Sequence, residues 1–357
     1  MRYATALLFL ACSPLFGCST PTAGPEDDAP TKKTKAAHEH TFGPIEVAAG
    51  AEVDELCVSW TLDNAETLYV SAVEMVATTG FHHSNWFWVP EDRYLGDDGG
   101  DGDGVWNCQD RVFNEAVAAA TGGVLFAQST QAEHEVQRFG EGVVIPIPPR
   151  SRVVAGLHLL NTTPKDLDAE LALELHDVPE DAVHTRLSGL SLQYKALEIP
   201  PMSQSAFSGS CAVGDKHDEA LGRPLDLSLY YVLPHYHDLG TGLRLEALKD
   251  GEPTTIFSED GAVGDPLGVT LSEPFDMTGY DELRFTCHYD NPRTESVGWG
   301  IGDQEMCVLL AFTDSENLWG GGVFDPSEEG PEMVGDVPHF GGPCTLITYP
   351  SKAHTDP

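Results

Sequence analysis

The sequence predicts an all-β protein built from β-sandwiches. Short runs rich in apolar and β-branched residues recur along the chain, and helical periodicity is scarce. The 36 Gly and 25 Pro supply the turns between these runs. The segment from about residue 45 to residue 350 has ample length for two domains of about 150 residues each.

Eight runs are expected to form strands: residues 55–62, 67–76, 153–160, 169–175, 227–233, 243–248, 283–289 and 308–313. The stretch 114–121 is expected to form a short helix. The Pro-rich segment Ile199-Pro200-Pro201 is the predicted boundary. We therefore expect an N-terminal domain over residues 45–199 and a C-terminal domain over residues 200–350.

The N-terminus resembles the signal of an exported bacterial lipoprotein. A basic residue, Arg2, precedes a short apolar stretch, and Leu15-Phe16-Gly17-Cys18 resembles a lipobox in which Cys18 takes the lipid. An ordinary signal peptide with a chance Cys is the alternative. Residues 1–17 are thus the predicted signal, and the polar residues 18–44 a flexible tether. Ser19 after Cys18 predicts sorting to the outer membrane or the periplasm if the host is Gram-negative.

The chain is strongly acidic, with 19 Lys and Arg against 57 Asp and Glu and a net charge of −38. This balance excludes nucleic acid as a natural partner, because phosphate binding requires the opposite sign. Beyond the predicted signal and Cys18, six cysteines remain, at positions 57, 108, 211, 287, 307 and 344. An even number in an exported protein predicts three disulfides.

Histidines form the clearest chemical pattern in the chain. His235 and His237 are two residues apart, so on a strand both side chains face the same way and reach one ion. The adjacent pair His82-His83 reaches one ion only where a bulge distorts the strand or where the strand ends. His158 lies centrally in an apolar run, where a buried imidazole needs a partner, either a metal or a hydrogen bond.

Other polar groups have weaker signals. The acidic, Gly-rich stretch from Asp97 to Asp103 is either a calcium loop or a solvated loop, and it lacks the bidentate Glu of an EF-hand. Asn85 either orients a histidine ligand or forms a turn. The remaining histidines, among them His134 and His176, have no comparable partners in the sequence and receive no ligand role.

These residues, taken in order, resemble the copper type II, ascorbate-dependent monooxygenases. The family pattern is a His-His pair, a single His in an apolar strand, a His-x-His followed by Leu-Gly, and a Glu-Met-Cys. This chain has His82-His83, His158, the run from His235 to Gly240, and Glu305-Met306-Cys307. The similarity spans about residues 45–350.

The resemblance implies two tandem antiparallel β-sandwich (jelly-roll-like) domains, each with one copper ion, that face each other across an open cleft. His82, His83 and His158 would hold the copper that stores and passes an electron. His235, His237 and Met306 would hold the catalytic copper, which binds O₂. A thioether is a soft donor that favours Cu(I), the form that binds O₂. Ascorbate or a similar reductant would be the co-substrate.

The resemblance also implies the disulfides Cys287–Cys307 and Cys211–Cys344, which leave Cys57–Cys108 as the third. The chain departs from the peptide-hydroxylating members of the family at Gly156, Leu233 and Leu310. We expect Leu233 and Leu310 to make the pocket apolar, so that the enzyme hydroxylates a C–H bond of a small organic molecule. The alternative is a non-catalytic copper-binding lipoprotein that sequesters or delivers copper and touches the membrane only through its lipid anchor.

Overall fold

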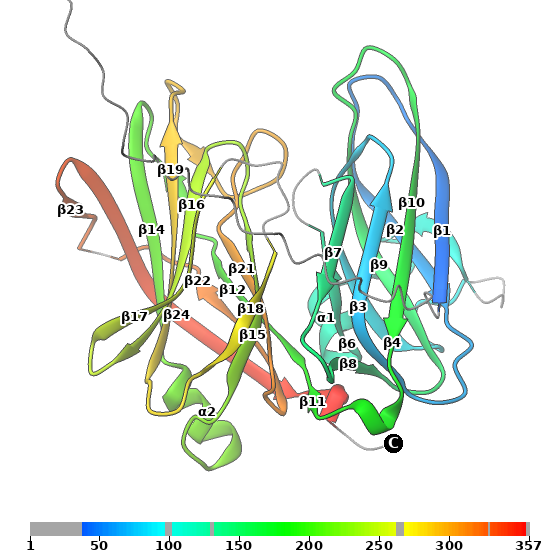
Figure 1. The fold of residues 1–357 in the computed structure, drawn as a ribbon. Helices are drawn as coiled ribbons and strands as arrows, with labels where there is room; N and C mark the ends of the chain where they lie inside the picture. Colours follow the sequence, from blue (N-terminus) through cyan, green and yellow to red (C-terminus); the bar gives the residue numbers. More distant parts are fainter. Residues whose placement is uncertain (1–37, 97–101, 129–131, 262–267, 328, 355–357) are drawn as a thin grey trace, which may run out of the picture. The chain divides into compact units, whose positions relative to one another are not determined.

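Two β-sandwiches follow one another along the chain (Figure 1). We call them the N-terminal sandwich (residues 38–187) and the C-terminal sandwich (residues 188–354). The computed structural model describes residues 38–96, 102–128, 132–261, 268–327 and 329–354. About 59% of the structure is strand and about 7% is helix, which confirms the predicted all-β fold.

The N-terminal sandwich consists of two sheets. The six-stranded sheet runs in the order β1 (His38–Val47), β10 (Leu167–Asp177), β3 (Leu68–Ala77), β8 (Val143–Ile147), β11 (Thr185–Arg186), with β7 (His134–Arg138) paired to β3. The five-stranded sheet runs in the order β5 (Gly104–Asn107), β2 (Glu52–Thr61), β9 (Ser151–Leu160), β4 (Phe81–Pro90), β6 (Gly123–Ala127). The helix α1 (Glu115–Thr121) and the 3₁₀ turn η1 (Glu180–Ala182) complete this sandwich.

The C-terminal sandwich is one large sheet folded onto itself. Its strands run in the order β17 (Glu252–Asp260), β16 (Gly240–Lys249), β19 (Glu282–Asn291), β14 (Ser203–Cys211), β24 (Val337–Pro350), β22 (Asn317–Val323), β12 (Ser188–Tyr194), β21 (Val308–Thr313), β15 (Ser228–His235), β18 (Val269–Asp276). The remaining elements are β23 (Glu332–Val334) on β24, the pair β13 (Glu198–Ile199) and β20 (Val297–Gly298), the helix α2 (Val213–Leu221), and the turn η2 (Lys352–His354).

The long strand β24 joins the two layers of the C-terminal sandwich. Its first part pairs in parallel with β14, over His339 to Pro343. Its second part pairs antiparallel with β22, over Cys344 to Pro350. Three strand pairs are parallel, namely β8–β11, β12–β22 and β14–β24. The other strand pairs of the described sheets are antiparallel, as expected.

Alternation of side chains builds the core. In β10, Ala169, Leu171, Leu173 and Leu175 are buried, while the residues between them face outward. Burial of each leucine side chain stabilises the folded state by about 1.5–3 kcal/mol relative to its exposure to water.

An apolar contact joins the two sandwiches. The Phe139 ring lies 5.4 Å from the Phe312 ring and 6.1 Å from the Tyr231 ring, centroid to centroid. Leu233, which is 1% exposed, belongs to the same cluster of buried residues. Leu233 is therefore a core residue of this contact, and Leu310 packs against the same cluster. That the two leucines line a substrate pocket stays a prediction.

All eight predicted strands and the predicted helix are present, as β2, β3, β9, β10, β15, β16, β19, β21 and α1. The Asn114 side chain caps α1, because its oxygen accepts a hydrogen bond from the Val117 amide at 3.0 Å.

Two predicted boundaries differ from the structure. Residues 38–44, expected in the tether, form the first part of β1, where Phe42 is buried against the core. As an edge strand, β1 buries few apolar side chains, so its sequence signal is weak. The domain boundary lies near Ser188 and not at residue 200, because β12 already pairs with β21 and β22. Pro200 and Pro201 follow β13, inside the C-terminal sandwich.

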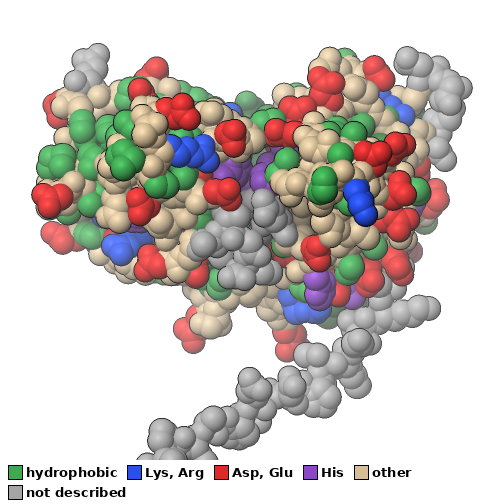
Figure 2. Space-filling view, turned by 90° about the horizontal axis from the view of Figure 1, so that it is seen from above, with side chains coloured by type: hydrophobic (Ala, Val, Ile, Leu, Met, Phe, Trp, Pro, Cys, Tyr) green, Lys and Arg blue, Asp and Glu red, His purple; other side chains and the backbone are tan. Residues whose placement is uncertain are grey.

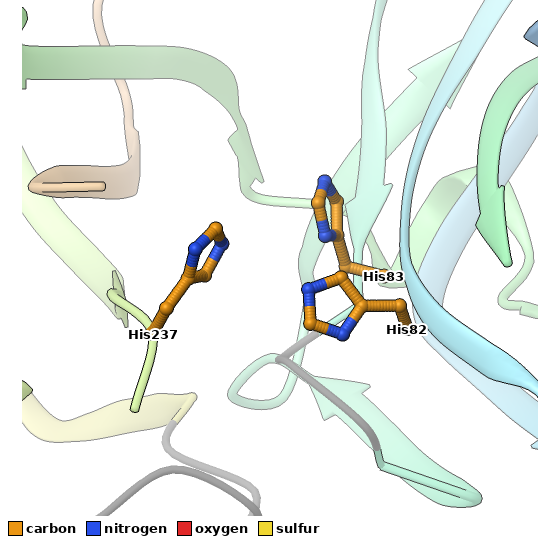
Figure 3. A group of neighbouring side chains, drawn as sticks. All are labelled: His82, His83 and His237. Atoms are coloured by element: carbon orange, nitrogen blue, oxygen red, sulfur yellow. The ribbon is translucent and has the colours of Figure 1, made fainter. Parts of the chain in front are cut away.

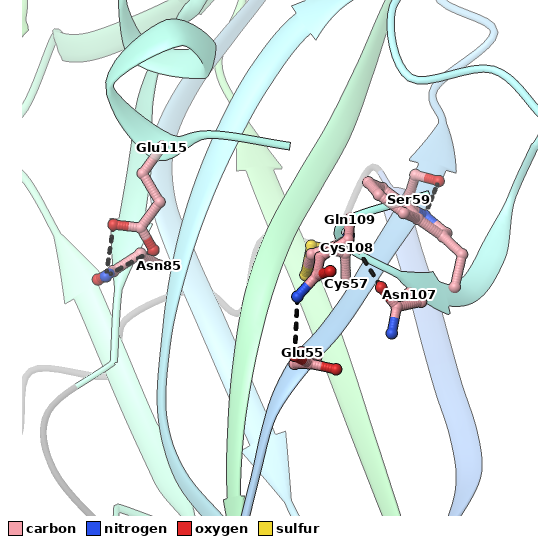
Figure 4. The surroundings of a disulfide bond; sticks show 9 residues. Glu55, Cys57, Ser59, Asn85, Asn107, Cys108, Gln109 and Glu115 are labelled. Atoms are coloured by element: carbon pink, nitrogen blue, oxygen red, sulfur yellow. Dashed lines mark hydrogen bonds between the residues drawn. A yellow bond between two sulfur atoms is a disulfide. The ribbon is translucent and has the colours of Figure 1, made fainter. Parts of the chain in front are cut away.

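The three predicted disulfides, Cys57–Cys108, Cys211–Cys344 and Cys287–Cys307, are all present. Figure 4 shows Cys57 in β2 bonded to Cys108, which directly follows β5. The predicted signal 1–17 and Cys18 lie outside the described residues. Among the residues that are described, no helix has the length and apolar character needed to cross a membrane.

Candidate metal centre

The His82-His83 pair lies on a β-bulge, as its sequence requires. In the pairing of β4 with β9, Phe81 faces Leu159 and His83 faces His158, so the register shifts between Phe81 and His83. The extra residue, His82, lets two neighbouring side chains point to the same side of the strand. Of the two predicted alternatives, a bulge or a strand end, the register shift bears out the bulge.

The third predicted histidine of the N-terminal sandwich lies directly beside this pair. His158 in β9 is the register partner of His83, and the centroids of the two rings are 4.1 Å apart. Asn85 takes neither predicted role: its amide donates to the Glu115 carboxylate at 3.1 Å (Figure 4).

In the C-terminal sandwich, His235 and His237 lie close together because the strand ends at His235 and the chain turns directly after it. His235 is the last residue of β15, and His237 lies beyond the strand, where its carbonyl accepts from the Gly240 amide at 2.9 Å. The two ring centroids are 5.3 Å apart. Strand alternation alone, which the spacing suggests, is therefore not what brings these imidazoles together.

His237 has a fixed orientation. Its Nδ1 lies 2.9 Å from the carbonyl oxygen of Gln304. When Nδ1–H donates to this carbonyl, Nε2 keeps its lone pair for a metal. Nε2 is buried and makes no hydrogen bond to any described residue. The same holds for Nδ1 of His83.

Glu305 ties the His237 turn to the segment that carries Met306. Its carboxylate accepts hydrogen bonds from the amides of His237 at 2.8 Å, Leu239 at 2.7 Å and Met306 at 3.3 Å. Burial raises the pKa of Glu305 to about 7, and the three amides act in the opposite direction. Sequence reasoning assigned Glu305 only to the family motif and missed this positioning role, which needs the folded turn to become visible.

Met306 lies on the segment between Glu305 and β21 and is partly buried. Its carbonyl accepts a hydrogen bond from the Tyr289 hydroxyl at 2.6 Å. Its backbone is therefore anchored beside the His237 turn. Its role as a thioether ligand stays a prediction.

Five imidazoles from the two sandwiches form one group, here called the imidazole cluster: His82, His83, His158, His235 and His237. The His82 ring lies 5.3 Å from the His237 ring, and the His83 ring lies 4.9 Å from the His235 ring. His82, His83 and His237 each place a ring nitrogen within 4.8 Å of the other two (Figure 3). In the space-filling view of Figure 2, histidine side chains gather where the two sandwiches meet.

This arrangement differs from the expectation of two sites facing each other across an open cleft. The group of three ring nitrogens within 4.8 Å of one another takes His82 and His83 from one predicted site and His237 from the other. The rings are uncharged at neutral pH, so they pack against one another without electrostatic repulsion. The apolar contact of Phe139 with Phe312 holds the two sandwiches, and with them the two sets of imidazoles, together.

Burial keeps the imidazoles neutral. Burial, with the neighbouring His237 and His158, lowers the pKa of His82 to about 4. Burial and the surrounding imidazoles also lower the pKa of His83 and of His235 well below the ordinary value. Burial lowers the pKa of His158 and of His237. Neutral imidazole is the form that binds a metal.

Two other predicted features lie apart from the cluster. Of the predicted calcium loop, residues 97–101 lie outside the described residues. Asp103 is committed to the fold, because it accepts from the Thr61 amide at 2.9 Å and pairs with Arg152 at 2.5 Å. A cavity of about 560 Å³ lies between Tyr69 and Glu316, and no residue of the imidazole cluster lines it.

Comparison with known proteins yields no family. No protein-family model matches the chain, and no curated protein matches it. Among solved structures, the major capsid protein of bacteriophage PM2 is similar at 8% identity and a TM-score of 0.30, covering 78% of this chain and 97% of that one. A protein from Parabacteroides distasonis described as secreted has 8% identity and a TM-score of 0.20, covering 79% and 90%. The PBSX exported protein XepA has 10% identity and a TM-score of 0.20, covering 78% and 87%. Likenesses this weak carry no argument about function.

Proposed function

We propose that the protein is a copper-dependent monooxygenase that hydroxylates a C–H bond of a small organic substrate. The observation that carries this proposal is the imidazole cluster, in which five neutral, mostly buried rings from both sandwiches come together. Such rings suit copper in either oxidation state. Two of them, His83 and His237, each have a buried ring nitrogen that makes no hydrogen bond to the described residues. A bound metal ion would give each of these nitrogens a partner.

We assign the predicted ligands to two copper ions, as the family resemblance implies. His82, His83 and His158 would hold one copper ion, and His235, His237 and Met306 would hold the other. Bound copper supplies O₂ activation and one-electron transfer. The overall reaction joins one oxygen atom to the substrate carbon and reduces the other to water, so it consumes two electrons and two protons. An external reductant such as ascorbate supplies the electrons.

The chain itself contributes positioning. The Gln304 carbonyl fixes the His237 ring, and the Glu305 carboxylate fixes the backbone on both sides of it. A ligand held by such outer partners loses little freedom when the metal binds.

One observation favours a second function, that of a non-catalytic copper-binding protein. The rings of the two predicted ligand sets approach within 4.9 and 5.3 Å, centroid to centroid, which leaves little room for a substrate between them. Leu233 is buried in the contact between the sandwiches.

Copper content and oxygen uptake separate the two functions. Purified protein is stripped with chelator, reloaded with copper, dialysed, and assayed with ascorbate and a panel of small organic substrates. About two coppers per chain together with substrate-dependent uptake support the monooxygenase. Copper without uptake supports the carrier. Retention of no copper would contradict both.

We also propose that the protein is exported and anchored by a lipid on Cys18. The three disulfides support export, because disulfides persist in oxidising compartments. Replacement Cys18→Ala should move the protein from the membrane fraction to the soluble fraction. Unchanged membrane association in this variant would contradict the anchor.

A further inference from the structure

A second group of metal-ligating side chains lies on the outer face of the six-stranded sheet. It consists of Glu74 in β3, Glu174 and His176 in β10, and His134 in β7, and we call it the sheet cluster. Glu174 and His176 are two residues apart on one strand, so they share a face. Their neighbours Leu173 and Leu175 point into the core.

The sheet pairing places like charges opposite one another. Glu74 and Glu174 are register partners in the β3–β10 pair. Like charges directly opposite on neighbouring strands destabilise a sheet. Within the described part of the chain, the ion pairs of these two carboxylates are with His134 and His176 only, and neither meets a Lys or Arg. A cation bound between Glu74 and Glu174 would therefore relieve the repulsion between their carboxylates.

The distances fit a single ion. The His176 Nε2 lies 3.6 Å from a Glu74 oxygen and 3.9 Å from a Glu174 oxygen. Two ligand atoms of one ion, at bonds of about 2.1 Å, lie at most about 4.2 Å apart. The His134 Nε2 lies 2.9 Å from the other Glu74 oxygen, near enough to supply a fourth ligand after a small rotation.

His176 gives the second, independent observation. Its side chain is only 8% exposed, yet both ring nitrogens make no hydrogen bond to any described residue. A buried polar group without a partner destabilises the folded state. The Nε2 atom is directed at the two carboxylates, at distances too long for hydrogen bonds and suitable for a shared cation.

From this geometry we infer that the sheet cluster is a second metal site, separate from the copper proposal, that binds a divalent cation of the zinc type. Two carboxylates and two imidazoles suit Zn²⁺, and the absence of a sulfur donor among the four disfavours Cu(I). The two carboxylates neutralise the charge of the ion. Bound metal would link β7, β3 and β10, three neighbouring strands of one sheet. The sequence assigned no ligand role to His134 and His176, because only the folded sheet brings both of them to Glu74.

Zinc binding to copper-loaded protein tests this inference. Copper is first added as Cu(I), which the imidazole cluster accepts and the sheet cluster disfavours, and Zn²⁺ is then added and counted after dialysis. About one zinc per chain is expected, with a zinc absorption edge that shows only nitrogen and oxygen ligands. The variants Glu74→Gln and Glu174→Gln should each weaken zinc binding at least about tenfold, since loss of even an outer partner of a ligand has this effect.

Glu170→Gln is the matched control, because Glu170 is an exposed carboxylate on the same strand and the same face, outside the cluster. It should bind zinc as the parent protein does. The variant His83→Ala, which disrupts the imidazole cluster, should also keep its zinc. Zinc lost in His83→Ala but kept in both glutamate variants would place the ion in the imidazole cluster and overturn the inference. No zinc in the parent protein would overturn it as well, and neither result bears on copper binding.

Discussion

The imidazole cluster and the sheet cluster both contain histidines, but they differ in burial and in the charge of their other members. The first is buried between the sandwiches and contains five imidazoles and no carboxylate ligand. The second lies on a sheet surface and pairs two imidazoles with two carboxylates that are 28% and 30% exposed. Donor charge and softness, and not the number of histidines, distinguish a copper site from a zinc-type site. The two clusters should therefore respond differently to the same treatments.

The largest effect is expected from His83→Ala. His83 contacts four other histidine rings, at centroid distances of 4.1 to 6.2 Å, so it is central to the imidazole cluster. We expect this variant to lose copper from the cluster during dialysis, measured as metal content per chain. His339→Ala serves as control and should keep its copper, because His339 lies outside the imidazole cluster, with its ring 6.4 Å from the His288 ring. Equal copper in both variants would break the assignment.

Acid should destabilise the metal-free protein through the imidazole cluster. The pKa of His82 is lowered to about 4, from an unfolded value of 6.5. Between these values the unfolded chain binds a proton that the folded chain does not, so the free energy of unfolding falls as the pH drops. His82 alone would account for about 3 kcal/mol between pH 7 and pH 4. Chemical denaturation in chelator at several pH values measures this loss. A flat profile down to pH 4 would mean that the rings are not buried in solution.

The next effect concerns the positioning of His237. In Glu305→Gln, one of the oxygens that now accept backbone amides becomes an NH₂ group. Leaving a buried amide unpaired costs about 1–3 kcal/mol, and loss of an outer partner weakens metal binding about 10–100-fold. Denaturation and copper titration should both register the change. Asp303→Asn is the control, because the contact of Asp303 with Arg293 is made by its backbone carbonyl and not by its side chain. If the two variants behave alike, Glu305 does not position the site.

The smallest effect is expected from Met306→Ile. The substitution preserves an apolar side chain but removes the soft donor, so the fold and Cu(II) binding should persist while Cu(I) binding weakens. X-ray absorption of the reduced protein should show a copper–sulfur component that the variant lacks. No sulfur scattering in the parent protein would remove Met306 from the ligands and make the imidazole cluster purely nitrogenous.

The sequence predicted much of the fold because its strongest strands are buried and bounded by turns. The strand run around Val154 is almost continuously apolar, and the run around Leu245 alternates apolar with charged residues, so both give a clear strand signal. The edge strand β1 gives a weaker signal, and its first residues were assigned to the tether. His82, His83, His158, His235 and His237 were found from spacing and from family resemblance. Their mutual contact could not be found, because it depends on the packing of Phe139 against β15 and β21. The sheet cluster was missed because Glu74 and His176 lie about 100 residues apart, and only the register of β3 with β10 unites them.

The long strand β24 has a consequence for the order in which the chain folds during synthesis. It is the last strand in the described chain, and both layers of the C-terminal sandwich depend on it. Cys344, within it, is bonded to Cys211 at the end of β14, 133 residues earlier. The N-terminal sandwich can thus close while the second half is still emerging, and the second half cannot. His235 and His237 belong to the sandwich that is completed last. The imidazole cluster is therefore incomplete until β24 has folded.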